Sequence, residues 1–502
     1  MLKIHTTLQN EDFNDYGKIT VNGKDADIQK ARVSAMPYNV PWQGTQRPLD
    51  QTEEAGFVSF ESDEKAEIVF EPKFKTLHDR SDVVVRPLSK NIKVKNENGK
   101  LAFTLTEYGA YTVEIDGFHN ALHIFFNPVR DFYAEAKAER EEKDIIRFLP
   151  GEHDIGRYYI KDHTTVVIEG GAVLYGSLIS VCAKDVRICG YGIIDGSREK
   201  RENFLPYPQD YHNSFEDKEY LQKALKENYY PSTCVRLYAC ENVLVEGITL
   251  RDSSTFAMIP AGCNNIVIDN VKTIGMWRYN SDGIDFINCT NAVLKNSFLR
   301  NFDDCIVIKG VKGWDYKNNE NIIVENCVVW CDWGRAIEYG AETNAREYKN
   351  IIVRNVDVIH GSTVNIDIQH HNDAEIHHCV FEDIRVEYTK YQLPDYIYQP
   401  GVPYHGRVNT GHPALIGVPI LDYGYFCDEK TYKNGCVHDI LYRNIKVFAD
   451  KDVPAITSYF RGLSPEHDVK NIRIENLTVN GERITTLDNI ETNEFTSNIT
   501  VG

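Results

Sequence analysis

Three aspartates are spaced so that they can act together in acid–base chemistry. Asp282 lies in the stretch Asn280-Ser281-Asp282-Gly283, and the pair Asp303-Asp304 follows 21 residues after Asp282. Carboxyl groups packed together repel one another, so at least one of them should have a raised pKa and keep its proton. A protonated carboxyl can protonate a leaving oxygen while an ionised partner activates water. A solvated ladder of turn aspartates would use the same residue types, and the spacing of the two motifs is what favours catalysis.

A repeated unit must position these aspartates. An asparagine followed by alternating Val, Ile or Leu residues recurs at intervals of 23, 26, 30 and 29 residues, beginning at Asn242, Asn265, Asn291, Asn321 and Asn350. The pattern returns at Asp439 and Asn471. Periods of about 20 to 50 residues indicate a solenoid or a propeller, and short units without helical periodicity favour one coil of a right-handed parallel β-helix. We expect the asparagines at turns, in left-handed backbone geometry, with hydrogen bonds along the stack.

The chain divides into three predicted parts. Residues 1–135 contain no cysteine and consist of short predicted strands separated by turns, which is typical of an antiparallel β-sandwich. Residues 136–146 are a charged linker or short helix, and residues 147–502 are the parallel β-helix. Two segments, about 198–230 and about 390–436, interrupt the repeat and are expected to shape one face of the solenoid.

The repeats also predict which residues face one another. Aligning the units stacks four segments, which begin at Asp282, Asp304, Arg335 and Val364. Adjacent coils of a β-helix lie about 4.8 Å apart. Asp282 and Asp304 should therefore be near neighbours, with Asp303 beside them.

These motifs resemble those of a known family. Asn-Ser-Asp followed by Asp-Asp-Cys is similar to the Asn-Thr-Asp and Asp-Asp pattern of glycoside hydrolase family 28, the polygalacturonase family, and the resemblance covers roughly residues 145–502. It implies a pectin-lyase-like solenoid and an inverting hydrolase that needs no cofactor. It also implies that Asp303 matches the general acid and that Asp282 and Asp304 match the pair that activates water.

A second family shares other features. The predicted sandwich ahead of the β-helix is similar to the arrangement in glycoside hydrolase family 49, the dextranase and isopullulanase group. The stretches Val328-Val329-Trp330, Ile337-Glu338 and 357–360 are similar to that family as well. The resemblance implies a comparable trio of catalytic aspartates.

Two motifs of the polygalacturonases are missing. Where they carry Gly-His-Gly, this chain has Gly334-Arg335-Ala336, and where they carry Arg-Ile-Lys, it has Asp367-Ile368-Gln369. The two cations of Arg-Ile-Lys hold the galacturonate carboxylate. A uronate would meet Asp367 at that point, which costs several kcal/mol when the two charges are desolvated. The sequence therefore predicts a neutral or amino-sugar substrate.

The side chains that flank the inward isoleucines should share one outer surface. This surface is acidic and polar, which suits sugar hydroxyls, while aromatic rings nearby can stack on sugar rings. Salt bridges from Glu338 and Asp367 to Arg335 or Lys309 are the structural alternative, and either His370 or its neighbour is expected to reach the cleft. The predicted substrate-binding residues are Asp285, Lys309, Arg335, Glu338, Asp367, Gln369, His370, Tyr279 and Trp333; Trp277, Trp330 and Tyr339 crowd the same region.

Composition excludes several partners. Lys and Arg number 55 against 74 Asp and Glu, a net charge of −19 that argues against nucleic acid and anionic membranes. No stretch approaches a membrane span, and no apolar region of a signal peptide follows the N-terminus, so we expect a cytoplasmic protein, or a secreted one if a leader has been removed. The twelve cysteines form no Cys-x-x-Cys pair and are expected to be buried thiols rather than disulfides or metal ligands. The oligomeric state stays open.

The leading hypothesis is an inverting glycoside hydrolase that acts on a neutral, α-linked polysaccharide or oligosaccharide. The expected cytoplasmic location favours exo action on imported oligosaccharides. The alternatives are a polygalacturonase acting on pectic substrate, a β-helical polysaccharide lyase in which aspartates bind Ca²⁺ and Arg335 is the base, and a non-catalytic glycan-binding β-helix.

Overall fold

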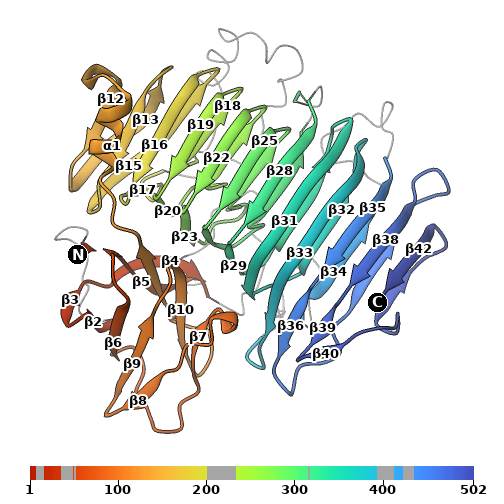
Figure 1. Cartoon of the computed structure of the whole chain (residues 1–502), viewed down its shortest axis with the longest axis horizontal. Coiled ribbons are helices and arrows are strands. Elements are labelled where there is room, and N and C mark those ends of the chain that lie inside the picture. The colour runs from red at the N-terminus through yellow and green to blue at the C-terminus, as the bar shows by residue number, and fades with distance from the viewer. Residues whose placement is uncertain are drawn as a thin grey trace.

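The computed structural model of the chain is an all-β molecule (Figure 1). The structure describes residues 1–6, 16–35, 49, 52–199, 233–311, 313–314, 317–392, 412–421 and 435–502. Two small sheets form the N-terminal part and one continuous 31-stranded sheet forms the rest. The predicted right-handed parallel β-helix preceded by a β-sandwich is confirmed. No helix in the described ranges has the length and hydropathy needed to cross a membrane.

Two sheets packed face to face form the sandwich. The six-stranded sheet has the order β1-β5-β11-β10-β7, with β4 on β5; its strands are β1 (Leu2–His5), β4 (Gln29–Ser34), β5 (Thr52–Ser62), β7 (Val83–Arg86), β10 (Gly109–Ile115) and β11 (Leu122–Asn127). The five-stranded sheet has the order β3-β2-β6-β9-β8; its strands are β2 (Gly17–Val21), β3 (Lys24–Ala26), β6 (Ala66–Pro72), β8 (Lys95–Glu97) and β9 (Lys100–Leu105). Phe60, Phe70 and Ile124 lie in the core between the sheets. Pairing is antiparallel except between β5 and β11, which are parallel.

The charged run after the sandwich forms a helix and a turn. Helix α1 (Phe132–Glu139) begins at Asp131, whose side chain accepts a hydrogen bond from the backbone amide of Ala134 at 2.9 Å. Only Phe132 and Ala136 of the helix are buried, because the other residues are charged or face solvent. A 3₁₀ turn (Glu142–Asp144) then leads into the first strand of the β-helix.

Each coil of the β-helix contributes up to three strands, and strands of successive coils pair in parallel in three columns. The first column contains β14 (Thr165–Ile168), β16 (Lys184–Gly190), β19 (Glu241–Glu246), β22 (Asn264–Asp269), β25 (Thr290–Lys295), β28 (Asn319–Glu325), the first parts of β31 (Glu347–His360) and β33 (Glu375–Tyr388), β35 (Val437–Arg443), β38 (Val469–Glu475) and β42 (Thr496–Val501).

The second column contains β17 (Ile193–Asp195), β20 (Thr249–Arg251), β23 (Lys272–Met276), β26 (Phe298–Asn301), β29 (Val328–Cys331), the later parts of β31 and β33, β36 (Lys446–Ala449) and β39 (Thr478–Val479). The third contains β18 (Val235–Tyr238), β21 (Met258–Ala261), β24 (Ile284–Ile287), β27 (Ile306–Gly310), β30 (Arg335–Thr343), β32 (Val364–His370), β34 (Ala414–Pro419), β37 (Ser458–Arg461) and β41 (Ile490–Thr492). The strands β12 (Ile145–Phe148), β13 (Gly151–Ile160) and β15 (Ala172–Val181) begin the solenoid, and β40 (Glu482–Arg483) pairs back on β39.

Asparagine ladders mark the turns, as the repeats predicted. Asn291 and Asn321 have φ of 55° and 56°, a left-handed conformation that asparagine tolerates better than most residues. The side-chain amide of each ladder residue donates to the coil below: Asn321 to Asn291 at 3.0 Å, and Asn350 to Asn321 at 3.2 Å. A second ladder runs along the turn between the first and second columns, where Asn326 donates to Asn296 at 3.2 Å. Each ladder therefore links neighbouring coils at the edges of the sheets.

The interior of the coils is apolar and includes thiols. Eleven cysteines lie in the described ranges, all of them free thiols, nine of them buried. The prediction of buried thiols is confirmed for these residues, and Cys427 lies outside the described part of the chain. Burial raises the pKa of Cys234, Cys327 and Cys379 to about 12, so these thiols stay protonated and inert.

The six-stranded sheet packs against the second column of the β-helix. Phe118 and Phe125 of the sandwich contact Trp330 and Phe298 of the β-helix in one apolar cluster. Arg300 is buried beneath the sandwich, with its guanidinium 3.7 Å from the ring centre of Trp330. Polar pairs also cross the interface: His360 contacts Glu114 at 2.5 Å and Lys272 donates to Asn127 at 2.7 Å. The sandwich is thus firmly attached beside the strands that lead to the aspartates.

Candidate active site

The register of the third column places the aspartates as the repeats predicted. Ile284, Ile306, Ile337 and Ile366 pair in succession along β24, β27, β30 and β32. Reading back along these strands puts Asp282 beside Asp304, and Asp304 beside Arg335. All three residues lie at the turn between the second and third columns. The predicted alignment of the coils is therefore confirmed.

Side chains below the aspartates hold this turn in place. Asn301, the last residue of β26, donates to the backbone carbonyl of Ser281 at 3.1 Å and accepts from the hydroxyl of Thr273 at 2.7 Å. Two adjacent coils are joined through this one amide, because Thr273 and Ser281 both belong to the coil that precedes Asn301. Gly334 lies against the aspartates on the other side: a Cβ there would lie 2.6 Å from the amide nitrogen of Asp304. Only glycine permits the close approach of this coil.

Lys309 binds several of the carboxylates. Its Nζ lies 2.8 Å from Asp282, 3.2 Å from Asp285 and 3.9 Å from Glu342, and the lysine is buried. Asp282 and Asp285 are also buried. The single cation therefore neutralises part of a carboxylate cluster and is already in contact with protein groups before any ligand arrives.

Arg335 has the same relation to a second group of carboxylates. Its guanidinium lies 3.4 Å from Asp367, 3.9 Å from Asp304 and 4.0 Å from Glu338. The backbone amide of Arg335 also donates to Asp304 Oδ1 at 2.7 Å. The salt bridges that the sequence offered as an alternative role for Glu338 and Asp367 are thus present. Both oxygens of Glu338 nonetheless lack a hydrogen-bond partner among the described residues.

Burial raises the pKa of several of these carboxyls. Burial, and then the charge of Asp304, raises the pKa of Asp303 to about 7. Burial raises the pKa of Asp285 to about 7 against the opposing effect of Lys309, and it also raises the pKa of Asp282. Burial and the neighbouring Asp367 raise the pKa of Glu338 well above its usual value. The cluster therefore holds protons near neutral pH, as the packing of the aspartates predicted.

Sequence reasoning missed Glu342. A bulge between Ile308 and Gly310 changes the pairing of β27 with β30, so that Gly310 lies opposite Thr343. The extra residues on β30 place Glu342 near Lys309, 3.9 Å away. Nothing in the sequence signals the bulge, because regular pairing of these strands would leave Glu342 beyond reach.

Two of the predicted aromatic residues lie together beside the aspartates. Trp333 stacks on Phe302 with ring centres 5.3 Å apart, and Tyr279 lies 5.5 Å from Trp333. Trp333 is half-buried and offers part of its ring to the surface. Two other aromatics of the region are placed elsewhere: Trp330 is covered by the sandwich, and Tyr339 is fully buried inside the coil.

The residues at the end of β32 alternate between the two sides of the strand. Gln369 is nearly buried, and its side-chain amide lies 2.9 Å from His371 Nε2. The side chain of His370 points to the opposite face of the strand from Gln369 and is fully buried. Its ring nitrogens contact the carbonyl of Ala374 at 2.6 Å and the hydroxyl of Thr343 at 3.2 Å. Both ring nitrogens are used within the fold, so the prediction that His370 binds substrate is wrong. The two-residue period of the strand is the reason.

The described residues also bear on metal binding and on the two insertions. No group of three or more His, Cys, Asp or Glu side chains in the described ranges has the geometry of a metal site. Most of the two insertions predicted near 198–230 and 390–436 lies outside the described residues.

Comparisons with known proteins agree with this fold. Residues 177–402 match the sequence model of Glycosyl hydrolases family 28. A probable endopolygalacturonase D of Neosartorya fischeri is 24% identical over 256 residues, 49% of this chain and 46% of that protein. An exopolygalacturonase of Cochliobolus carbonum is 27% identical over 135 residues, 25% of this chain and 28% of that protein. The chain thus spans less than half the length of these curated relatives.

Solved structures extend the likeness to the sandwich. Dex49A from Penicillium minioluteum superposes with a TM-score of 0.59 at 12% identity, over 99% of this chain and 96% of that one. An exopolygalacturonase from Thermotoga maritima superposes with a TM-score of 0.50 at 17% identity, over 71% and 84%. At these identities the likeness shows the fold alone. Fold and family match together define the class, a parallel β-helix protein that is similar in sequence to Glycosyl hydrolases family 28 over residues 177–402. The arrangement of a sandwich ahead of a β-helix is shared with Dex49A.

Proposed function

We propose that this protein is an inverting glycoside hydrolase that cleaves a neutral, α-linked polysaccharide or oligosaccharide. Asp303 protonates the glycosidic oxygen, and Asp282 and Asp304 activate the attacking water. The observation that carries the proposal is the charge of the site. Among the residues that the structure describes, seven carboxyl groups surround two cations, Lys309 and Arg335, and both cations already contact carboxylates.

The environment of Asp303 supports its role as the acid. A general acid must hold its proton at the working pH and yet release it to the leaving group, which requires a pKa near that pH. Burial and the charge of Asp304 raise the pKa of Asp303 to about 7, which meets this requirement. Asp304 and Asp282 lie on adjacent coils beside it, as a pair that binds one water molecule would.

The polar face argues for a substrate without a carboxylate. Asp367 stands where the polygalacturonase motif has a cation, and Arg335, which lies 3.4 Å from Asp367, is also shared with Asp304. A uronate would therefore place its charge among buried carboxyls. The pKa of Glu338 is raised, and neither of its carboxyl oxygens has a hydrogen-bond partner in the described structure. A protonated carboxyl both donates and accepts hydrogen bonds, which matches a sugar hydroxyl.

Release of reducing ends from a panel of polymers tests this function. The panel contains dextran, pullulan, galactan, arabinan and polygalacturonate, and we expect hydrolysis of at least one neutral polymer and at most trace activity on polygalacturonate. NMR of the first product should show inverted anomeric configuration. Preferred cleavage of polygalacturonate would overturn the neutral substrate, and a product with an unsaturated end absorbing in the ultraviolet would identify a lyase instead. The Asp303→Asn protein is the control for contaminating activity.

A further inference from the structure

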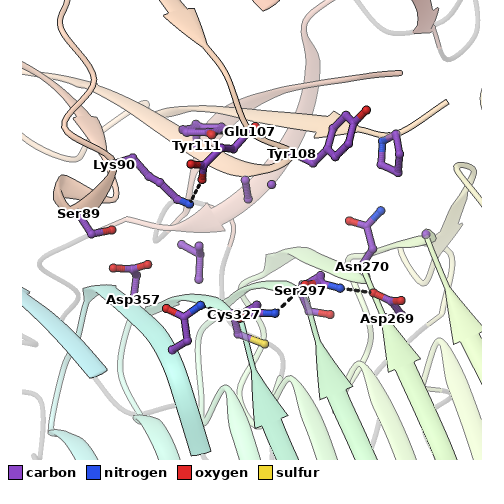
Figure 2. A pocket seen from close by; sticks show the side chains of 18 of the residues that line it. Ser89, Lys90, Glu107, Tyr108, Tyr111, Asp269, Asn270, Ser297, Cys327 and Asp357 are labelled. Atoms are coloured by element: carbon purple, nitrogen blue, oxygen red, sulfur yellow. Dashed lines mark hydrogen bonds and ion pairs between the residues drawn. The ribbon is translucent and has the colours of Figure 1, made fainter. Parts of the chain in front are cut away.

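A groove of about 840 Å³ lies between the sandwich and the β-helix, away from the aspartates. One wall is formed by β10 and the residues just before it, and the other by the turn between the first and second columns (Figure 2). Tyr108, Tyr111 and Glu107 lie on the sandwich side, and Asn270 and Ser297 lie on the β-helix side. The proposed reaction uses none of these residues.

Tyr108 offers an aromatic platform to the groove. Its side chain is 52% exposed, one of the most exposed large rings in the described structure. It is held in place by an edge-on contact with Phe126, with ring centres 5.0 Å apart. A ring that is fixed and exposed loses little conformational entropy when a sugar stacks on it. Tyr111 supports the same loop by donating its hydroxyl hydrogen to the carbonyl of Glu107 at 2.9 Å.

The opposite wall carries a ladder of exposed amides. Asn296 donates to Asp269 at 2.8 Å, Asn326 donates to Asn296 at 3.2 Å, and Asn355 donates to Asn326 at 2.6 Å. A side-chain amide has two N–H donors and an oxygen that accepts twice, so each member uses only part of its hydrogen-bonding capacity within the ladder. The members repeat once per coil, about 4.8 Å apart, which is close to the length of one sugar ring along an extended glycan.

The charges of the groove balance. Lys90, Arg130, Arg385 and Lys446 line it together with the acidic residues Glu107, Glu246, Asp269 and Asp357. Most of them pair with each other: Arg130 lies 2.6 Å from Glu246, Arg385 lies 2.5 Å from Asp357, and Lys90 contacts Glu107. The groove therefore presents no net charge, and its polar groups suit an uncharged ligand rather than a polyanion.

We propose that this groove is a second, non-catalytic binding site for an extended, uncharged glycan. The choice of an uncharged glycan rests on the proposed function, since the site would hold another stretch of the same polymer. The groove and the aspartates lie at opposite ends of one short strand: Ser297 precedes β26, and Asp303 follows it. At about 3.3 Å per residue, some 20 Å of chain separates Ser297 from Asp303. A polymer held in the groove stays close to the catalytic turn.

Affinity electrophoresis of the full chain tests the site. The protein carries Asp303→Asn to prevent turnover, and the gels contain dextran, pullulan, galactan, arabinan or polygalacturonate. We expect at least one neutral polymer to retard the protein, and we expect Tyr108→Ala to weaken that retardation at least about fivefold in apparent affinity. The matched control is Tyr159→Ala on β13, a 37% exposed tyrosine outside the groove, which should leave retardation unchanged.

Kinetics separate the groove from the active site. In the chain with Asp303 intact, Tyr108→Ala should lower kcat/KM for the polymer and leave kcat/KM for its short oligosaccharides unchanged. Equal retardation of the Tyr108→Ala and parent proteins, or no retardation of the parent by any neutral polymer, would overturn the second site. If retardation depends on Tyr108 while no polymer is hydrolysed, the second site stands and the proposed hydrolase function fails.

Discussion

At the scale of single residues, the carboxyl groups of the site outnumber its cations in the described part of the chain. Lys309 and Arg335 each contact three carboxyls, and burial favours the protonated form of these carboxyls. Asp303 keeps its proton to about pH 7, whereas an exposed aspartate would lose it near pH 4. Desolvation and the neighbouring charge of Asp304 thus give Asp303 the pKa that an acid needs near neutral pH.

Replacing the proposed acid should abolish turnover and spare the fold. Asp303→Asn keeps the shape of the side chain but cannot donate the proton, so we expect kcat to fall by roughly 10³-fold. Reducing-sugar assays measure the loss, and circular dichroism with thermal melting checks the fold. Retention of more than a tenth of the activity would show that another group supplies the proton.

The pH profile should follow the titration of Asp303. The acid acts only when protonated, and because its pKa is raised to about 7, kcat/KM should fall about tenfold per pH unit above pH 7. Below pH 7 this group stays protonated and places no limit on the rate. Initial rates from pH 4 to 9 measure the profile, and a rate that stays constant up to pH 9 would contradict the assignment of the acid.

At the scale of elements, a glycine allows one coil to approach the aspartates closely. Gly334 lies directly against the turn that carries Asp303 and Asp304. The turn is also fixed by Asn301, which joins two adjacent coils. Backbone packing of the β-helix, rather than any single side chain, thus sets the distances between the proposed catalytic groups.

Adding a methyl group at Gly334 should disturb the site. In Gly334→Ala the new Cβ would lie 2.6 Å from the nitrogen of Asp304, so the turn must shift. Displacement of a catalytic group by about 1 Å can cost about 10²-fold in rate, and we expect a loss of that order in kcat. The control is Gly99→Ala, a left-handed turn position in the sandwich with open space around it, which should cost about 1 kcal/mol of stability and no activity. Equal activity of both variants would contradict the role of Gly334.

At the scale of the whole molecule, the sandwich is part of the structure around the site. It covers the second column of the β-helix (Figure 1) and buries Arg300 and Trp330. The turn with Asp303 and Asp304 comes directly after β26 of this column. The same arrangement creates the groove between the sandwich and the β-helix. The acidic surface around the aspartates and the groove, whose charges balance, therefore lie at two edges of the interface between the sandwich and the β-helix.

Truncating the central tryptophan of this interface should destabilise the molecule. Trp330→Ala removes the ring beneath Arg300 and leaves a cavity, and we expect a loss of about 3–5 kcal/mol in the free energy of unfolding. Urea titration followed by fluorescence and circular dichroism measures the effect. Trp333→Ala, which removes a half-buried ring, should lower the free energy of unfolding clearly less. Similar losses for the two variants would show that the sandwich contributes little to stability.

The sequence by itself determined the fold class and the turn where the three aspartates meet. The recurring asparagines and alternating Val and Ile residues specify coil length and register, because the side chains of a strand alternate with a period of two. That register was enough to align Asp282, Asp304 and Arg335, and to place Asp285, Glu338 and Asp367 on one face. It also identified the ladders, since asparagine is the residue that left-handed turns favour.

Only the tertiary structure decided the rest. The bulge that brings Glu342 to Lys309 has no signature in the sequence, because it depends on how two strands pair across coils. The sequence pattern predicted His370 on the outer surface, but its side chain is buried inside the fold. The reason is that side chains of β32 alternate between the inner and outer faces up to the end of the strand. Trp330 and the groove at Tyr108 depend on where the sandwich packs, and packing between domains follows from the shape of two folded surfaces rather than from a local pattern.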